Sequence, residues 1–145
     1  MGDCIVKRYD EWNEVKKETQ SKEFHFSIKT REIFWVKIGQ NIGSEEFGKG
    51  KLFSRPVIVV RQLTSDMFIG IPTTTTTKND NDYFHTINYI NNKKEKITSC
   101  AMIYQFKTFS KKRITSKIGK ISSSEFEEIH NKLVKLLFPP TKSRT

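Results

Sequence analysis

An arginine placed directly before a proline is the first feature of this sequence that could do chemistry. Arg55 precedes Pro56 at the start of the β-branched run 57–60. Because proline fixes its own backbone and keeps the preceding residue extended, Arg55 should be held at the start of a strand. There, the fork of donors on its guanidinium matches two oxygens of a phosphate group. A pairing of Arg55 with Glu45 or Glu46 of its own loop explains the arginine equally well.

A run of threonines over residues 73–77 continues the apolar segment 67–72. Threonine tolerates strands well, so the run predicts the end of a strand. Hydroxyl groups at such an end can donate hydrogen bonds to a phosphate oxygen. Threonines more often simply occupy solvent-facing strand positions, and that interpretation stays open.

A third stretch, residues 105–120, is strongly basic and contains no acidic residue. Phe106 and Phe109 lie among its cations, as aromatic rings do where they stack on nucleic-acid bases. A solvated basic rim around two core phenylalanines is the alternative. The cations are Lys107, Lys111, Lys112, Arg113, Lys117 and Lys120.

Neither the cysteines nor the histidines predict a metal site. Cys4 and Cys100 are too few for a disulfide framework and are expected to be reduced thiols. His25 and His85 lie in alternating strand patterns and His130 lies on a helix flank, so structural roles are favoured for all three. Their spacing does not supply the partners that a zinc site with two cysteines needs. We therefore expect no metal and no cofactor.

Size and charge narrow the class of protein. The 145 residues suffice for one domain, and the formal net charge of +10 attracts polyanions, among which nucleic acid is favoured. No apolar run approaches the ~20 residues that span a membrane. The amino-terminal residues also lack the apolar stretch of a signal peptide. These features predict a cytoplasmic protein that has no membrane segment.

The hydrophobic pattern predicts short strands between two helices. Acidic residues in a first turn and a narrow apolar stripe predict a helix over residues 10–21. Ser122 and Glu125 form a capping-box pattern that opens a second, amphipathic helix ending before Pro139. The predicted strands cover residues 24–28, 33–38, 57–60, 67–77, 85–90 and 100–106.

Two of these segments stand out. Residues 33–38 are nearly all apolar, which predicts a strand buried on both faces. A long glycine-rich loop follows and ends at Ser54. Many short strands with a helix at each end predict a mostly β (α+β) protein, a small barrel with helical cover.

Several short motifs follow one another in an order that is typical of a known family. They are residues 31–36 (REIFWV), 41–45 (NIGSE), 55–60 (RPVIVV), 71–73 (IPT), 104–114 (YQFKTFSKKRI) and 118–122 (IGKIS). Together they resemble the MazF/PemK family of toxin endoribonucleases, from about residue 31 to residue 137. The chain departs from the family's usual pattern in its longer loop 44–55, in Arg31 where glycine is common, in Lys107 where arginine is common, and in the helix before residue 30.

The resemblance implies a fold and a division of the chain. The fold would be a small SH3-like β-barrel, the plasmid-maintenance toxin fold, with a C-terminal amphipathic helix and an added N-terminal helix. Residues 1–30 would hold the N-terminal helix and a lead-in strand. Residues 31–138 would form the toxin barrel, and residues 139–145 a basic flexible tail.

The resemblance also implies an activity and roles for residues. The activity would be metal-independent cleavage of single-stranded RNA by attack of the ribose 2′-hydroxyl on the adjacent phosphate. Arg55 would stabilise the charge of the transition state or share in proton transfer, and Thr73 would hold a phosphate oxygen. Arginine stays protonated, so the resemblance does not assign the general base. The implied substrate contacts are Ser44, Glu45, Gln105, Lys107, Lys111 and Arg113.

The implied assembly is a homodimer that binds a cognate antitoxin with an acidic, flexible tail. Two other functions fit the same shape. One is an RNA-binding or protein-binding barrel without cleavage, and the other is a toxin of the same fold that poisons a topoisomerase.

Overall fold

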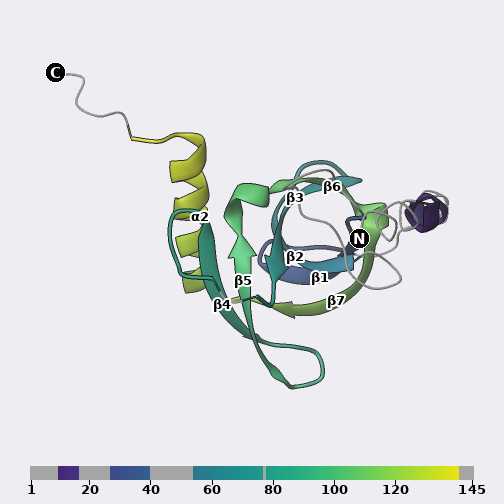
Figure 1. The fold of residues 1–145 in the computed structure, drawn as a ribbon, viewed down its shortest axis with the longest axis horizontal. Coiled ribbons are helices and arrows are strands. Elements are labelled where there is room, and N and C mark those ends of the chain that lie inside the picture. The colour runs from purple at the N-terminus through teal and green to yellow at the C-terminus, as the bar shows by residue number, and fades with distance from the viewer. Residues whose placement is uncertain (1–9, 17–26, 40–53, 77, 141–145) are drawn as a thin grey trace.

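The computed structural model describes residues 10–16, 27–39, 54–76 and 78–140. Residues 10–16 are helical, and Figure 1 places this helix and α2 on opposite sides of the molecule. The remaining elements, in chain order, are β1 (Glu32–Lys37), β2 (Ser54–Gln62), β3 (Met67–Thr74), β4 (Phe84–Ile90), β5 (Lys96–Met102), the 3₁₀ turn η1 (Ile103–Gln105), β6 (Lys107–Ser110), the 3₁₀ turn η2 (Lys111–Arg113), β7 (Ile114–Lys120) and α2 (Ser123–Leu137).

The strands form one curled antiparallel sheet in the order β4-β5-β3-β2-β1-β7, and β6 pairs with the first half of β3 (Figure 1). The predicted mostly β fold with a C-terminal helix is confirmed. Within the described residues no strand pairing joins β4 to β7, so the ladder does not close into a complete barrel. The Asn92 backbone N–H donates to the Ile118 carbonyl at 2.9 Å across this opening.

Two apolar cores lie on opposite faces of the central strands. Ile33 of β1 is paired with Ile58 of β2, and Ile58 with Ile71 of β3; all three face the core that includes Ile129 and Leu133 of α2. The second core lies on the other face because successive strand residues point to opposite sides of a sheet. It contains Phe34, Val36, Val57, Val59, Phe68, Phe109 and Ile114, among others.

The last helix begins as its sequence predicts, with one difference. Ser122 is the N-cap, and its hydroxyl oxygen accepts from the Glu125 backbone N–H at 3.2 Å. The Glu125 carboxylate, however, accepts from the backbone N–H of Asn88 on β4 at 3.2 Å. Lys132 donates to the Phe84 carbonyl on the same strand at 3.0 Å. Side chains of α2 thus satisfy backbone groups along the outer edge of β4, which blocks further strand pairing there.

Other expectations from the sequence need correction or lie outside the described residues. The strand predicted over residues 100–106 ends at Met102 and is followed by η1. Residues 107–120 form β6, η2 and β7. Phe109 is buried against Phe68 with ring centroids 5.6 Å apart, so it is a core residue and not a stacking surface for bases. Residues 27–29 are not in a strand, and residues 24–26 lie outside the described part. No helix among the described residues is long and apolar enough to span a membrane.

The Ser122 cap generates a stability prediction. We expect Ser122→Ala to lower the free energy of unfolding by about 1 kcal/mol, because the Glu125 N–H loses its side-chain acceptor. Urea denaturation followed by circular dichroism measures the change. Ser123→Ala, one residue further along, is the matched control and should leave the stability near that of the wild type. Equal stabilities of the two variants would show that the cap contributes nothing.

Candidate functional site

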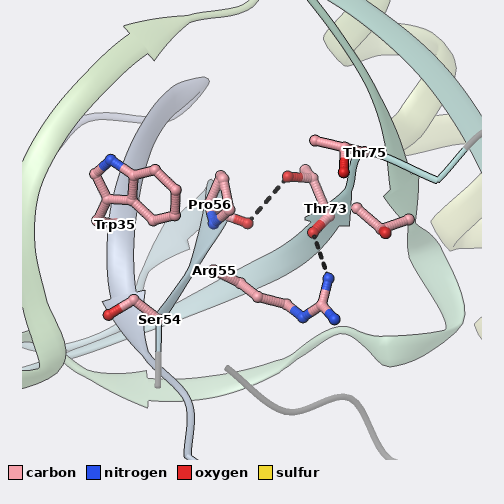
Figure 2. A pocket seen from close by; sticks show the side chains of 7 residues that line it. Trp35, Ser54, Arg55, Pro56, Thr73 and Thr75 are labelled. Atoms are coloured by element: carbon pink, nitrogen blue, oxygen red, sulfur yellow. Dashed lines mark hydrogen bonds between the residues drawn. The ribbon is translucent and has the colours of Figure 1, made fainter. Parts of the chain in front are cut away.

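A pocket of about 290 Å³ lies where β1 ends, β2 begins and β3 ends (Figure 2). The antiparallel register creates this meeting point, because Val36 is paired with Arg55 and Val57 with Pro72. The pocket is lined by Trp35, Ser54, Arg55, Pro56, Thr73, Thr74 and Thr75. The pocket therefore joins two of the three stretches that the sequence singles out, the arginine before the proline and the threonine run.

Arg55 is the second residue of β2 and is almost fully buried, at 6% exposure. Its side chain reaches across to β3, where Nη1 donates to the Thr73 carbonyl at 3.3 Å (Figure 2). A buried guanidinium interacts more strongly with an anion than an exposed one, because little water screens it. The predicted alternative, a pairing of Arg55 with Glu45 or Glu46, involves residues outside the described part of the chain.

Thr73 is the most buried residue of the site, at 1% exposure. Its hydroxyl donates to the Pro56 carbonyl at 3.2 Å, so it connects β3 to β2 directly beside Arg55. A hydroxyl has one hydrogen and two lone pairs. In this arrangement Thr73 can accept a hydrogen bond, and it can donate one to a phosphate oxygen only by leaving Pro56.

Trp35 lines the pocket but was not predicted as a site residue from the sequence. The expectation that residues 33–38 are buried on both faces is wrong at this position, because the Trp35 side chain is 42% exposed between buried neighbours. Trp35 is paired with Pro56, and Figure 2 shows its indole on the far side of Pro56 from Thr73. The signal in the sequence was a large aromatic ring with a polar N–H group in a mostly apolar strand. Rings of this kind often keep one side in water.

The predicted contacts from the basic stretch do not line the pocket. Lys107 is paired with Gly70 of β3, and its Nζ lies 5.3 Å from the centre of the Phe109 ring. Gln105 belongs to η1, on the segment that connects β5 to β6. Both β5 and β6 pair with β3, which places Gln105 and Lys107 beside the strand that carries Thr73.

Lys111 and Arg113 flank a different part of the sheet, and both have structural contacts. The Lys111 backbone N–H donates to the Asp66 carbonyl at 2.8 Å, and its side chain is buried. Arg113 Nη1 donates to the carbonyl of Lys37, the last residue of β1, at 2.9 Å. Burial lowers the pKa of the Arg113 guanidinium below its ordinary value. The remaining predicted contacts, Ser44 and Glu45, lie outside the described residues.

The other titratable groups support the fold. His85 Nε2 lies 3.1 Å from the Glu128 carboxylate and Nδ1 lies 3.0 Å from Lys132 Nζ, so His85 connects β4 to α2, consistent with the structural role predicted for it. Burial raises the pKa of the Cys100 thiol, which disfavours the nucleophilic thiolate. Within the described ranges, no three His, Cys, Asp or Glu side chains come together as a metal site.

Comparisons with known proteins identify a family for this chain from a sequence model and a shared fold from solved structures. Residues 29–137 match the model of a family described as PemK-like, MazF-like toxin of type II toxin–antitoxin system. MazF from Deinococcus radiodurans has a TM-score of 0.62 at 14% identity, covering 78% of this chain and 98% of that one. A mycobacterial endoribonuclease in complex with its cognate antitoxin has a TM-score of 0.57 at 12% identity, covering 79% and 99%. At these identities the likeness shows a shared fold. No curated protein sequence matches this chain.

The contact between Thr73 and Pro56 generates a second stability prediction. Thr73→Val keeps the shape of the side chain but leaves the part-buried Pro56 carbonyl without its hydroxyl donor. We expect the free energy of unfolding to fall by about 1–3 kcal/mol. Thr73→Ser retains the hydroxyl and should lose clearly less, which urea denaturation can resolve. If the valine variant is as stable as the serine variant, the hydrogen bond does not hold these strands together.

Proposed function

Because this chain belongs to the PemK-like, MazF-like toxins of type II toxin–antitoxin systems, we propose that it cuts single-stranded RNA and that the Arg55 pocket is the cleavage site. The observation that carries the proposal is that a buried guanidinium and a threonine hydroxyl line the same pocket. Negative charge grows on the phosphate oxygens in the transition state. A cation and a hydrogen-bond donor are the groups that stabilise such charge. The net charge of +10 favours the approach of a polyanion.

The proposed reaction uses the RNA's own nucleophile. The ribose 2′-oxygen attacks the adjacent phosphorus and gives up its proton, while the bond from phosphorus to the 5′-oxygen breaks and that oxygen takes a proton. The products are a 2′,3′-cyclic phosphate and a free 5′-hydroxyl. Arg55 stabilises the charge that builds on the phosphate oxygens, and Thr73 donates to one of them after leaving Pro56. No metal takes part in this scheme, and DNA is not cut because it lacks the 2′-hydroxyl.

Trp35 supplies a surface for the base next to the scissile phosphate. Its ring is large, partly exposed and part of the pocket wall, which suits stacking against an unpaired base. Stacking needs a base outside a duplex, so this wall favours single-stranded RNA. Gln105 and Lys107 are proposed to position the strand beyond the pocket, with Ser44 and Glu45 shaping a base site.

The partners follow the family. We propose a homodimer in the cytoplasm that is held inactive by a cognate antitoxin with an acidic, flexible tail. Two of the solved structures with this fold are toxins bound to their antitoxins, one mycobacterial and one from Deinococcus radiodurans. A strongly basic chain suits an acidic partner.

Cleavage itself is the first test. In EDTA, the wild-type protein should cut a long single-stranded RNA at defined sites and leave cyclic phosphate ends that mass spectrometry identifies. Arg55→Ala should lower the cleavage rate by at least about a hundredfold, because the transition-state charge loses its main stabilising group. Arg61→Ala is the matched control, since Arg61 is an exposed arginine on the same strand. Binding without cutting would favour an RNA-binding barrel, and gyrase inhibition without RNA cleavage would favour a topoisomerase poison.

Trp35 generates a separate prediction about binding. Trp35→Ala should weaken the binding of a 2′-O-methyl RNA, which cannot be cleaved, by roughly 1–3 kcal/mol, the usual contribution of one stacked base. Trp35→Phe should retain most of the affinity. Tyr83→Ala removes another exposed aromatic ring that does not line the pocket and serves as the control. Fluorescence anisotropy measures all four proteins, and an unchanged affinity for Trp35→Ala would exclude stacking there.

A further inference from the structure

Within the helix of residues 10–16, Trp12 is the one side chain that is buried. The indole is 6% exposed and packs against Gly39, two residues after the end of β1. The contact is so close that a Cβ on Gly39 would lie 2.1 Å from Trp12 Cε2. Gly39 also has a φ of +88°, a conformation that side chains disfavour. Backbone conformation and space both require glycine where the indole is seated.

Arg113 also contacts the Trp12 ring. The centre of its guanidinium lies 5.5 Å from the Trp12 ring, within the range of a cation–π contact. The same guanidinium donates to the Lys37 carbonyl at 2.9 Å. Trp12, Arg113 and Gly39 therefore hold the last residue of β1 and the chain that follows it. A planar guanidinium suits both contacts at once, which an ammonium does not.

β1 also contributes Trp35 to the Arg55 pocket, two residues before the end of the strand. Lys37 is paired with Ser54 and Val36 with Arg55, and on its other side Val36 is paired with Ile114, the residue after Arg113. One row of paired residues thus runs from Ile114 through Val36 to Arg55. The end of a strand unfolds locally more easily than its middle, and Arg55 is only the second residue of its strand. Pairing with a well-held neighbouring strand therefore matters at this position.

We propose that Trp12 and Arg113 are positioning residues that fix the end of β1 and thereby the placement of the Arg55 guanidinium. The inference rests on the proposed function in that it concerns the same pocket. In this proposal Arg113 contacts Trp12 and the Lys37 carbonyl and does not make the RNA contact that the sequence resemblance implies. The residues matched by the family model begin at residue 29, so Trp12 is an addition of this chain to the matched fold.

The experiment separates positioning from RNA binding. Trp12→Ala, Trp12→Phe and Arg113→Lys are compared with the wild type for the rate constant of RNA cleavage at saturation and for the Kd of a 2′-O-methyl RNA. Trp12→Ala and Arg113→Lys should lower the rate constant about ten- to a hundredfold and leave Kd unchanged, because a small displacement of a catalytic group is costly. Trp12→Phe should keep most of the activity, since a ring still faces the guanidinium.

Arg113→Lys is the informative variant because it keeps the positive charge. If Arg113 contacts phosphate, lysine preserves much of the affinity and the rate, and the positioning role is wrong. The double variant Trp12→Ala/Arg113→Lys should be no slower than the slower single variant, as expected for two residues of one unit. If the losses in rate constant of the two single variants multiply in the double variant, the residues act independently and the proposal is wrong. Circular dichroism checks that each variant is folded, which is expected because Trp12 belongs to neither apolar core.

A second readout does not need cleavage activity. Amide hydrogen exchange of residues 36–37 and 54–55 should be faster in Trp12→Ala and Arg113→Lys than in the wild type and Trp12→Phe. If the wild type cuts no RNA but these amides respond, the proposed function fails and the support of the β1 end stands. If RNA is cut and the amides do not respond, the function stands and the positioning proposal fails.

Discussion

The antiparallel register of β1, β2 and β3 is the constraint on which the rest of the structure depends. In this register Trp35 is paired with Pro56, and Val36 with Arg55. The same alignment puts the isoleucines of three strands on one face, where α2 covers them. A slip of one residue in the pairing would turn the isoleucines and the residues of the pocket to the wrong side of the sheet. The apolar cores therefore favour the register that brings Arg55 beside Thr73.

A buried arginine is costly unless its donors find acceptors, and one acceptor in this pocket is a backbone carbonyl. Arg55 donates to the Thr73 carbonyl, while the Thr73 hydroxyl donates to the Pro56 carbonyl. Each contact connects β2 to β3 near the start of one strand and the end of the other. The site is thus held by the same hydrogen bonds that a bound phosphate would compete for. Binding and local stability are coupled at Thr73, and the resting arrangement prevents the hydroxyl from serving both.

The sequence predicted strands around the pocket because Arg55, Pro56 and the apolar residues of β2 and β3 carry local signals, but the strand predicted over residues 67–77 ends at Thr74. Proline fixes a strand start, and alternating or continuous apolar residues mark the strands that follow. Prediction from the sequence failed where tertiary contacts determine the exposure or the partner of a side chain. The exposure of Trp35 depends on what neighbouring strands leave uncovered, and the burial of Phe109 on its packing against Phe68. The Glu125 side chain was predicted to close its own helix but contacts Asn88, a partner that no local pattern reveals.

The basic stretch shows why charge in a sequence overstates charge at a site. Lys117 is paired with Glu32 at 2.5 Å, Lys111 is buried, and Arg113 lies between Trp12 and the Lys37 carbonyl. These three cations are committed to the fold, so the positive character of residues 105–120 falls mainly on the others. A guanidinium has five donors in one plane, and a phosphate takes two of them side by side. With one edge on the Lys37 carbonyl and one face on Trp12, the Arg113 guanidinium has lost the freedom that such a contact needs. Its proposed effect on the pocket comes from holding the end of β1.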